Sequence, residues 1–190
     1  MSALTDRLNK VLDRLISDEL LSGRGLGNEI GFYILDYPPE EELAIREHIS
    51  FLLQQLPKKR PGIRVKHINL FEMVLDHLEE RNLLGKAIEQ AQKKGDKFLL
   101  KALEKPLHGT KIAPVFEKLC DIPNYDLFLV SGVGSVYPML RTHTLLNNLH
   151  HVMQAKPLVM FFPGRYDGQS LRLFGRLKDD NYYRAFKLVA

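Results

Sequence analysis

The sequence has little of what secreted and membrane proteins need. It contains one cysteine, Cys120, in 190 residues, so no internal disulfide can form, and we expect a reduced, cytoplasmic setting. The longest purely apolar run covers residues 158–162, whereas a helix needs about 20 apolar residues to cross a bilayer. The N-terminal segment alternates charged residues with leucine and lacks the apolar centre of a signal peptide. We therefore predict no transmembrane helix and no membrane association.

Complete catalytic and nucleotide-binding motifs are also missing. A Walker A loop needs a lysine after its glycines, but the glycine turn at 131–135, which follows an apolar run, has none. Pro138 also removes a backbone N–H donor at the start of the helical pattern that follows. The turn also lacks the third glycine of a dinucleotide fingerprint, and no Gly-x-Ser-x-Gly occurs. The seven histidines form no zinc-type spacing, and Cys120 is expected in the core. These absences predict a protein that is not an enzyme and has neither cofactor nor metal.

The charge is mildly basic. The formal net charge of +4 is too small to argue for nucleic acid by itself, because nucleic-acid binders concentrate positive charge on one face. Direct DNA contact is therefore doubtful on composition alone. Basic residues are nevertheless enriched towards the C-terminus, at Arg165, Arg172, Arg176, Lys178, Arg184 and Lys187.

What is present is an alternation of short apolar runs with helical patterns. Runs at 31–37, 63–70, 125–131 and 156–163 predict four buried strands, and apolar residues at helical spacing predict helices at 2–21, 40–56 and 138–153. A helical insertion of about 71–120 has breaks near Asn82, Gly85 and residues 94–96. A loop is expected at 164–168, and the end of the chain forms either a hairpin that turns at 178–181 or a last helix. Buried strands separated by helices predict an α/β fold in one domain, 1–190. We expect a mostly parallel sheet with flanking helices, as a Rossmann-like or degenerate P-loop-like three-layer sandwich.

The stretch that organises this fold is the glycine turn after the third strand. It consists of Ser131-Gly132-Val133-Gly134-Ser135, and a helical pattern begins near Pro138. Backbone N–H groups in such a turn can hold an anion at the carboxyl edge of a sheet. The candidate ligand-binding residues are Ser131, Gly132, Gly134 and Ser135, with Arg141 and Arg165 as clamps on a phosphate or carboxylate. The alternatives are a degenerate loop kept for packing or protein contact, and arginines in internal salt bridges with Asp167, Asp179 or Asp180.

Two further features stay open between a functional and a structural interpretation. Asp36 ends the first strand, where catalytic or metal-binding carboxylates of α/β sheets often lie, but it could equally cap a helix that begins near Pro39. Tyrosine and arginine, which are enriched at protein interfaces, gather near the C-terminus. The candidate interface residues are Tyr166, Arg172, Tyr182, Tyr183 and Arg184.

The same C-terminal stretches resemble a known family. Ser131-Gly-Val-Gly-Ser-Val-Tyr-Pro-Met-Leu-Arg, Phe162-Pro-Gly-Arg-Tyr-Asp-Gly, Leu171-Arg-Leu-Phe-Gly and Asp180-Asn-Tyr-Tyr-Arg-Ala-Phe are similar to the BrxB family, encoded in BREX bacteriophage-exclusion operons. The resemblance covers the whole chain in length and order and is densest from Tyr125 to Val189.

The resemblance implies a component of antiviral defence that acts beside a DNA methyltransferase, a large ATPase and the alkaline-phosphatase-like PglZ. It implies no catalytic residues, so the expected role is that of an adaptor, with PglZ as the expected partner. Its interface would be the Arg/Tyr-rich C-terminal segment or the helical insertion at 71–104. The alternative is a regulatory subunit that binds nucleotide or nucleic-acid phosphate through the glycine turn 131–135, Arg141 and Arg165.

Overall fold

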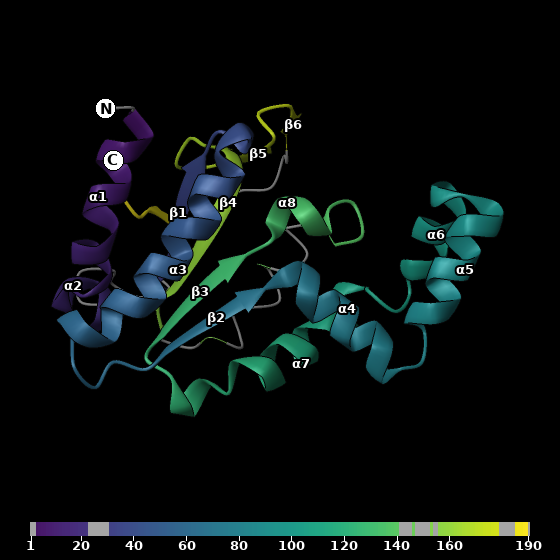
Figure 1. The fold of residues 1–190 in the computed structure, drawn as a ribbon, viewed down its shortest axis with the longest axis horizontal. Helices are drawn as coiled ribbons and strands as arrows, with labels where there is room; N and C mark the ends of the chain where they lie inside the picture. Colours follow the sequence, from purple (N-terminus) through teal and green to yellow (C-terminus); the bar gives the residue numbers. More distant parts are fainter. Residues whose placement is uncertain are drawn as a thin grey trace.

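A parallel β-sheet forms the centre of the molecule (Figure 1). The computed structural model describes residues 3–22, 31–140, 146, 153, 156–178 and 185–189. The parallel strands lie in the order β2-β3-β4-β1-β7. Their bounds are β1 Phe32–Tyr37, β2 Val65–Asn69, β3 Leu127–Ser131, β4 Leu158–Tyr166 and β7 Phe186–Lys187. The predicted α/β fold with a mostly parallel sheet is therefore confirmed.

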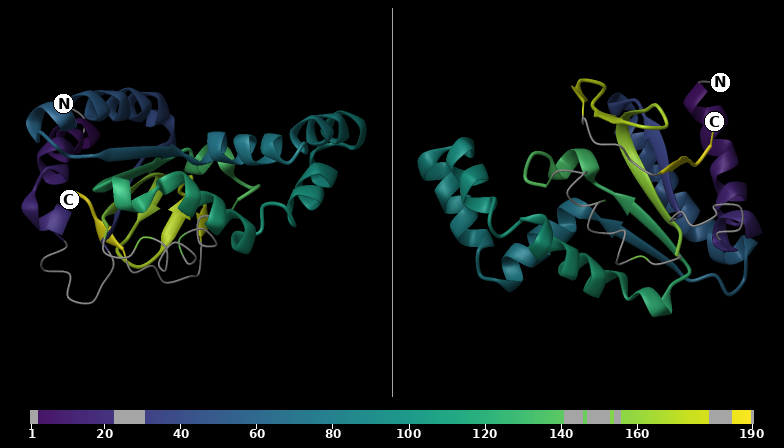
Figure 2. Two further views of the ribbon diagram at one scale, coloured as in Figure 1. Left: turned by 90° about the horizontal axis from the view of Figure 1, so that it is seen from below. Right: turned by 180° about the vertical axis from the view of Figure 1, so that it is seen from behind.

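Helices cover both faces of the sheet and give three layers (Figure 2). One face packs against α1 Ala3–Leu15, α2 Asp18–Ser22 and α3 Glu42–Lys59, which a 3-10 turn at Pro39–Glu41 precedes. The other face packs against α4 Leu70–Glu80, α7 Gly109–Cys120 and α8 Val133–Val136. Because successive strand residues point to opposite faces, each central strand supplies both cores, and every residue of β3 is buried.

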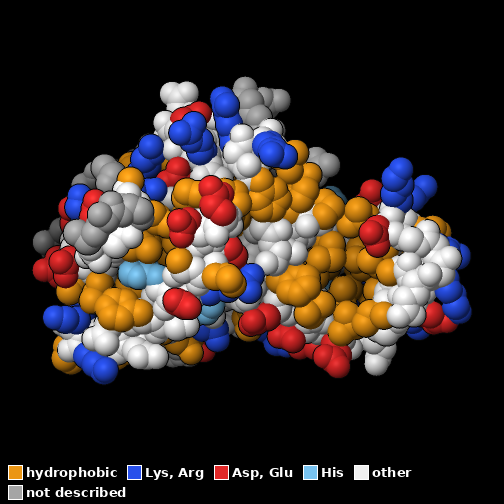
Figure 3. Space-filling model, turned by 45° about the horizontal axis from the view of Figure 1, so that its top comes forward, with side chains coloured by type: hydrophobic (Ala, Val, Ile, Leu, Met, Phe, Trp, Pro, Cys, Tyr) orange, Lys and Arg blue, Asp and Glu red, His pale blue; other side chains and the backbone are white. Residues whose placement is uncertain are grey.

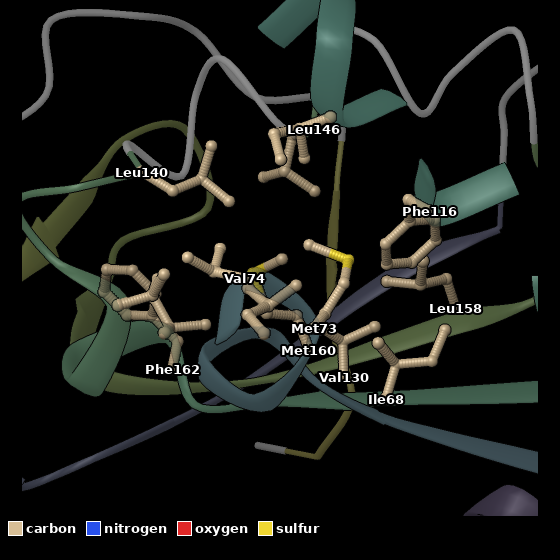
Figure 4. Packing of buried hydrophobic residues seen from close by; sticks show 14 of the residues in the cluster. Ile68, Met73, Val74, Phe116, Val130, Leu140, Leu146, Leu158, Met160 and Phe162 are labelled. Carbon is tan, nitrogen blue, oxygen red and sulfur yellow. The ribbon is translucent and has the colours of Figure 1, made fainter. Parts of the chain in front are cut away.

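The larger of the two cores lies between the sheet and α4, α7 and α8. Figure 4 shows Val130 of β3 and Met160 of β4 beneath Met73 of α4, with Phe116 of α7 beside them. Leu146 closes the same core from the segment that precedes β4. Full burial of a large apolar side chain contributes roughly 1.5–3 kcal/mol relative to leaving it in water, so this shared core holds the four elements together.

Two predicted helices end or begin at other residues. The predicted helix 2–21 is broken between α1 and α2, because the Ser17 hydroxyl accepts a hydrogen bond from the backbone N–H of Leu20 at 3.3 Å and so starts a new helix. The helix after the glycine turn begins at Val133 rather than near Pro138 and ends at Val136. Most of the predicted helix 138–153 lies outside the described residues.

The helical insertion includes an arm that projects from the body of the molecule (Figures 1 and 2). Its helices are α5 Leu84–Lys94 and α6 Asp96–Leu103, which pack against each other. The predicted breaks at Asn82 and at 94–96 are confirmed, since Asn82 and Gly95 have positive φ angles of 55° and 78°. The predicted break at Gly85 is wrong, because Gly85 lies within α5.

The C-terminal segment forms antiparallel strands on the end of β4. β4 continues through Tyr166, where a loop was predicted from residue 164, and β5 Leu171–Leu173 folds back against it. β6 Leu177–Lys178 then pairs with β5 across a turn at 174–176 that was not predicted, whereas residues 179–181 of the predicted turn at 178–181 lie outside the described residues. Phe174 and Gly175 adopt left-handed φ angles of 55° and 70°, which suit this tight turn. β7 pairs in parallel with β1.

Asp126 ties the starts of three segments together. Its carboxylate accepts hydrogen bonds from the Arg64 backbone N at 3.0 Å, Nε at 3.1 Å and Nη2 at 2.9 Å, and Lys156 Nζ lies 3.6 Å away. The hydrogen bonds from the Arg64 side chain are the main reason that the pKa of Asp126 falls to about 2. In the unfolded chain the pKa of an aspartate is about 3.9. Because the folded pKa is lower, the ionised carboxylate stabilises the fold at pH values above about 3.9, and this stabilisation is lost as the pH falls through the folded pKa of about 2.

Asp126→Asn is therefore expected to destabilise the protein at pH 7 but not at pH 2. We expect the free energy of unfolding to fall by about 1 kcal/mol at pH 7. This is less than the pKa shift alone implies, because solvent screens the Asp126 side chain, which is 33% exposed. Thermal unfolding of both proteins between pH 2 and pH 7 measures this difference. Asp13→Asn, at an exposed position of α1, is the control and should change nothing. A difference in melting temperature between Asp126→Asn and the wild type that stays constant from pH 2 to pH 7 would contradict a stabilising role for the ionised Asp126 carboxylate.

Candidate functional site

The glycine turn is closely packed by residues from other strands. Gly132 has a φ of 77°, and a Cβ there would lie 2.2 Å from Asn69 Oδ1. A Cβ on Gly134 would lie 2.9 Å from Phe174 Cε1 and 3.0 Å from Pro163 Cγ. Both glycines thus serve close packing with β2 and with the C-terminal hairpin. Anion binding by the turn stays a prediction, and these contacts give a sufficient reason for its glycines without a ligand.

The two serines of the turn have side-chain partners. Ser131 is buried, and its Oγ lies 2.8 Å from His67 Nε2 on β2. Ser135 Oγ accepts a hydrogen bond of 3.4 Å from Arg46 Nη2 on α3. Burial lowers the pKa of His67, which favours the neutral imidazole. Among the residues that the structure describes, no carboxylate hydrogen-bonds this imidazole, as the third group of a hydrolase triad would. The pair joins β2 to β3, and sequence reasoning missed it because only the strand register brings His67 and Ser131 together.

Of the two predicted arginine clamps, the structure describes Arg165, which is not brought to the turn. Arg165 lies on β4 beyond its parallel core, and Arg141 lies outside the described residues. Arg165 instead lines a cleft of about 780 Å³ to which the turn 131–135 contributes no residue. The charged side chains of this cleft are Arg7, Asp36, Glu40, Arg165, Asp167, Arg172 and Lys187.

The cleft lies where open α/β sheets bind ligands. It is formed at the carboxyl ends of β1 and β4, and Pro38, Pro39, Gly164 and Gly175 are among the residues that line it. The chain leaves β1 towards α3 on one face of the sheet and leaves β3 towards α8 on the opposite face. The cleft itself lies beside the ends of β4 and β1, which are neighbours in the sheet, at the carboxyl edge where open α/β sheets bind ligands.

Asp36 is held by groups that do not depend on a ligand. Arg7 Nη2 donates to Asp36 Oδ1 at 2.7 Å, Arg7 Nη1 donates to the Asp36 carbonyl oxygen at 2.8 Å, and the Tyr166 N–H donates to Oδ2 at 3.0 Å. The prediction that Asp36 caps a helix is wrong, because Pro38 is the N-cap of the following 3-10 turn and no side chain caps it. A catalytic role for Asp36 stays a prediction. No group of three His, Cys, Asp or Glu residues in the described part of the chain could hold a metal ion.

Asp167 is satisfied by its own loop. It accepts hydrogen bonds from the backbone N–H groups of Ser170 at 2.7 Å and Gln169 at 2.9 Å and from Ser170 Oγ at 2.7 Å. The backbone hydrogen bond from Ser170 is the main cause that lowers the pKa of Asp167 to about 2. Asp167 forms no ion pair with Arg165 or Arg172 in the described chain, contrary to one predicted alternative. The other predicted acidic partners, Asp179 and Asp180, lie outside the described residues.

The predicted interface residues that the structure describes differ in their exposure to solvent. Tyr166 is 2% exposed and donates its hydroxyl hydrogen bond to the Ala185 carbonyl at 2.7 Å, so its ring belongs to the core and offers no surface to a partner. Arg172 is exposed on β5. Tyr182, Tyr183 and Arg184 lie outside the described residues.

Cys120 is buried at the end of α7. Burial raises the pKa of its thiol to about 12, so almost no thiolate, the reactive form, exists at neutral pH. We expect a thiol reagent such as dithionitrobenzoate to leave the folded protein unmodified and to titrate one thiol after unfolding in guanidinium. Rapid labelling of the folded protein at pH 7.5 would show that the thiol is accessible and would contradict its place in the core.

The arm presents apolar side chains that the core does not bury. α5 contains no buried residue, and the side chains of Ile88 and Phe98 are 52% and 41% exposed. Lys94 Nζ lies 4.3 Å from the centre of the Phe98 ring. Figure 3 shows hydrophobic side chains around the hollow between the arm, on the right, and the body of the molecule. The hollow is a surface of protein-interface character, apolar inside with charged residues at its margin.

No helix among the described residues is long and apolar enough to cross a membrane.

Comparisons with known proteins give one consistent result. The family model described as "BREX protein BrxB" matches residues 66–188. A BREX protein BrxB of Bacillus cereus (strain H3081.97) is 44% identical over 191 residues, which cover 100% of this chain and 99% of that protein. A BREX protein BrxB of Escherichia coli O9:H4 (strain HS) is 39% identical over 183 residues, which cover 96% of this chain and 90% of that protein. No solved structure matches the chain.

Proposed function

Because the chain belongs to the BrxB family of BREX proteins, we propose that it is a non-enzymatic adaptor of a BREX bacteriophage-exclusion system and that it binds another BREX protein through its helical arm. The first candidate partner is the alkaline-phosphatase-like PglZ, as the family resemblance implies. The chain would act in the cytoplasm, where a lone reduced cysteine is stable.

The projecting arm is the observation that supports this proposal. α5 and α6 extend from the sheet and pack mainly on each other, and none of the α5 residues is buried. Helices of about 8–11 residues are marginal in water without a surface to pack on. Ile88 and Phe98 remain about half exposed, and apolar side chains in that state on a projecting element suit a protein partner.

An enzymatic function would have to use the Ser131–His67 pair or Asp36, and both support it less well than the arm supports an adaptor. Ser131 and His67 form a nucleophile-like pair, but neither lines the cleft, so no space for a substrate adjoins them there. Asp36 does line the cleft, but Arg7 and the Tyr166 N–H already occupy its oxygens. Each oxygen keeps a second lone pair, so these hydrogen bonds orient the carboxylate and give Asp36 a structural role that needs no substrate.

Co-purification tests the proposal. The full-length chain is expressed with the PglZ, methyltransferase and ATPase proteins of its operon, captured by a tag on PglZ and analysed by size-exclusion chromatography with mass determination. We expect this chain and PglZ to elute as one species whose mass is the sum of the two. Elution of the chain as a free monomer beside all of these proteins would overturn the adaptor function.

A further inference from the structure

Two arginines face each other across the antiparallel ribbon at the mouth of the cleft. Arg165 of β4 and Arg172 of β5 are register partners, so their side chains project from the same face of the ribbon. Both residues are exposed. Like charges directly opposite each other destabilise a sheet, so the fold alone gives no reason for this pair.

These cations form no ion pair with a carboxylate of the described residues, although the charge of Arg172 contributes a little to the lowered pKa of Asp167. Neither arginine has an oxygen of Asp or Glu within 4.0 Å, and the same holds for Lys187 of β7, which lines the same cleft. Two of the three acidic residues there are already engaged, Asp36 by Arg7 and the Tyr166 N–H, and Asp167 by its own loop. The third, Glu40, is exposed and forms no ion pair with either arginine. Figure 3 shows several Lys and Arg side chains at this upper end of the molecule.

The ribbon is built to hold this geometry. A Cβ on Gly164 would lie 2.1 Å from the Arg172 carbonyl oxygen and 3.0 Å from the Phe174 N, so only glycine lets β5 approach β4 this closely. Because Arg165 follows Gly164 directly, the same close approach sets Arg165 opposite Arg172. The positions of the two guanidinium groups are therefore coupled to the backbone of the strand pair.

We propose that this cleft binds a phosphate group, with Arg165 and Arg172 as paired guanidinium forks and Lys187 as a third cation. A carboxylate has two oxygens and one charge, which one arginine fork satisfies. A phosphate has more acceptor oxygens and, as a monoester, a charge near −2, which two adjacent forks match. A volume of about 780 Å³ lies within the range of small-molecule sites, so the phosphate can belong to a nucleotide. A nucleic-acid backbone that crosses the opening is the other source, and because each of its diesters carries one charge, two successive diesters would face the two arginines.

This inference is independent of the proposed adaptor function, because it concerns other residues than the arm. The experiment uses the full chain and four probes: pyrophosphate, ATP, a fluorescent 20-base DNA strand and an octa-aspartate peptide. Binding is measured by calorimetry or fluorescence anisotropy at 50 and 200 mM salt. We expect pyrophosphate to bind, and Arg165→Gln with Arg172→Gln to weaken it at least tenfold.

Two sets of controls separate the charge pair from a general loss of positive charge or of the fold. Lys111→Gln with Lys118→Gln removes the same charge from exposed positions of α7 and should leave binding unchanged. Arg172→Gln should leave the melting temperature unchanged or raise it, since it relieves the repulsion in the ribbon. Ile88→Glu in the arm should not affect phosphate binding.

The probes also distinguish the two sources of phosphate. ATP that binds more tightly than the DNA strand, with little salt dependence, assigns a nucleotide. DNA that binds more tightly, with affinity falling steeply from 50 to 200 mM salt, assigns a nucleic-acid backbone. The proposal is overturned if no phosphate probe binds at millimolar concentration, if the double arginine variant binds like the wild type, or if octa-aspartate binds more tightly than every phosphate probe.

Discussion

Gly164→Ala is expected to lower the stability of the protein by about 3 kcal/mol, a large loss for one added methyl group. The new Cβ would meet the Arg172 carbonyl oxygen at 2.1 Å, and both are fixed by strand pairing, so β5 has to move away from β4. For a chain of this length, that loss corresponds to a fall in melting temperature of about 6–12 °C. Thermal unfolding followed by circular dichroism measures it.

Gly85→Ala is the matched control for this substitution. Gly85 lies within α5 and has no atom within 4 Å of a Cβ, so the same added methyl group should leave the melting temperature unchanged or raise it slightly, because alanine favours a helix over glycine by about 1 kcal/mol. Equal melting temperatures for the two variants would contradict the close approach of β4 and β5.

Ile88→Glu combined with Phe98→Glu is expected to weaken binding to the BREX partner by about 100-fold or more. Each substitution places a charge where an apolar contact with the partner would form, and truncating an interface hot spot commonly costs 2 kcal/mol or more, while 1.4 kcal/mol corresponds to a factor of ten. Both side chains are exposed, so the free protein should unfold at its usual temperature. The dissociation constant is measured by biolayer interferometry with immobilised PglZ.

Leu43→Glu is the control for the arm variant. Leu43 is 72% exposed on α3, which packs on the opposite face of the sheet from α4. The substitution therefore introduces the same charge at an exposed apolar position that is remote from the arm. Its affinity for PglZ should equal that of the wild type. The arm is excluded as the contact surface if the double variant keeps its full affinity, or if Leu43→Glu weakens binding as much as the double variant does.

The parallel sheet could be predicted because its signals are local. The apolar runs that form β1 to β4 and the helical spacing of α1 and α3 are each contained in a few consecutive residues. The break at Asn82 and the one at 94–96 were predicted for the same reason, because polar and glycine residues interrupt a helical pattern within one turn. What these signals do not contain is the order in which strands pair.

The site could not be predicted, because its geometry depends on residues distant in the sequence. Gly132 looks like part of a phosphate loop until Asn69 from β2 is placed against it, more than sixty residues earlier in the chain. Arg165 was predicted to face the glycine turn, but β5 folds back on β4 and sets it opposite Arg172 instead. The sequence pattern located the basic residues correctly at the C-terminus, and the register of short antiparallel strands decides which of them face one another.

The central claim, that the arm is the surface through which this BrxB protein binds its partner, is tested most directly by hydrogen–deuterium exchange of the chain alone and in complex with PglZ. We predict slower exchange in the complex for residues 84–103, with little change in α1 or α3. Unchanged exchange in 84–103 together with protection of another surface, such as the ribbon at 164–173, would contradict the claim and place the interface there.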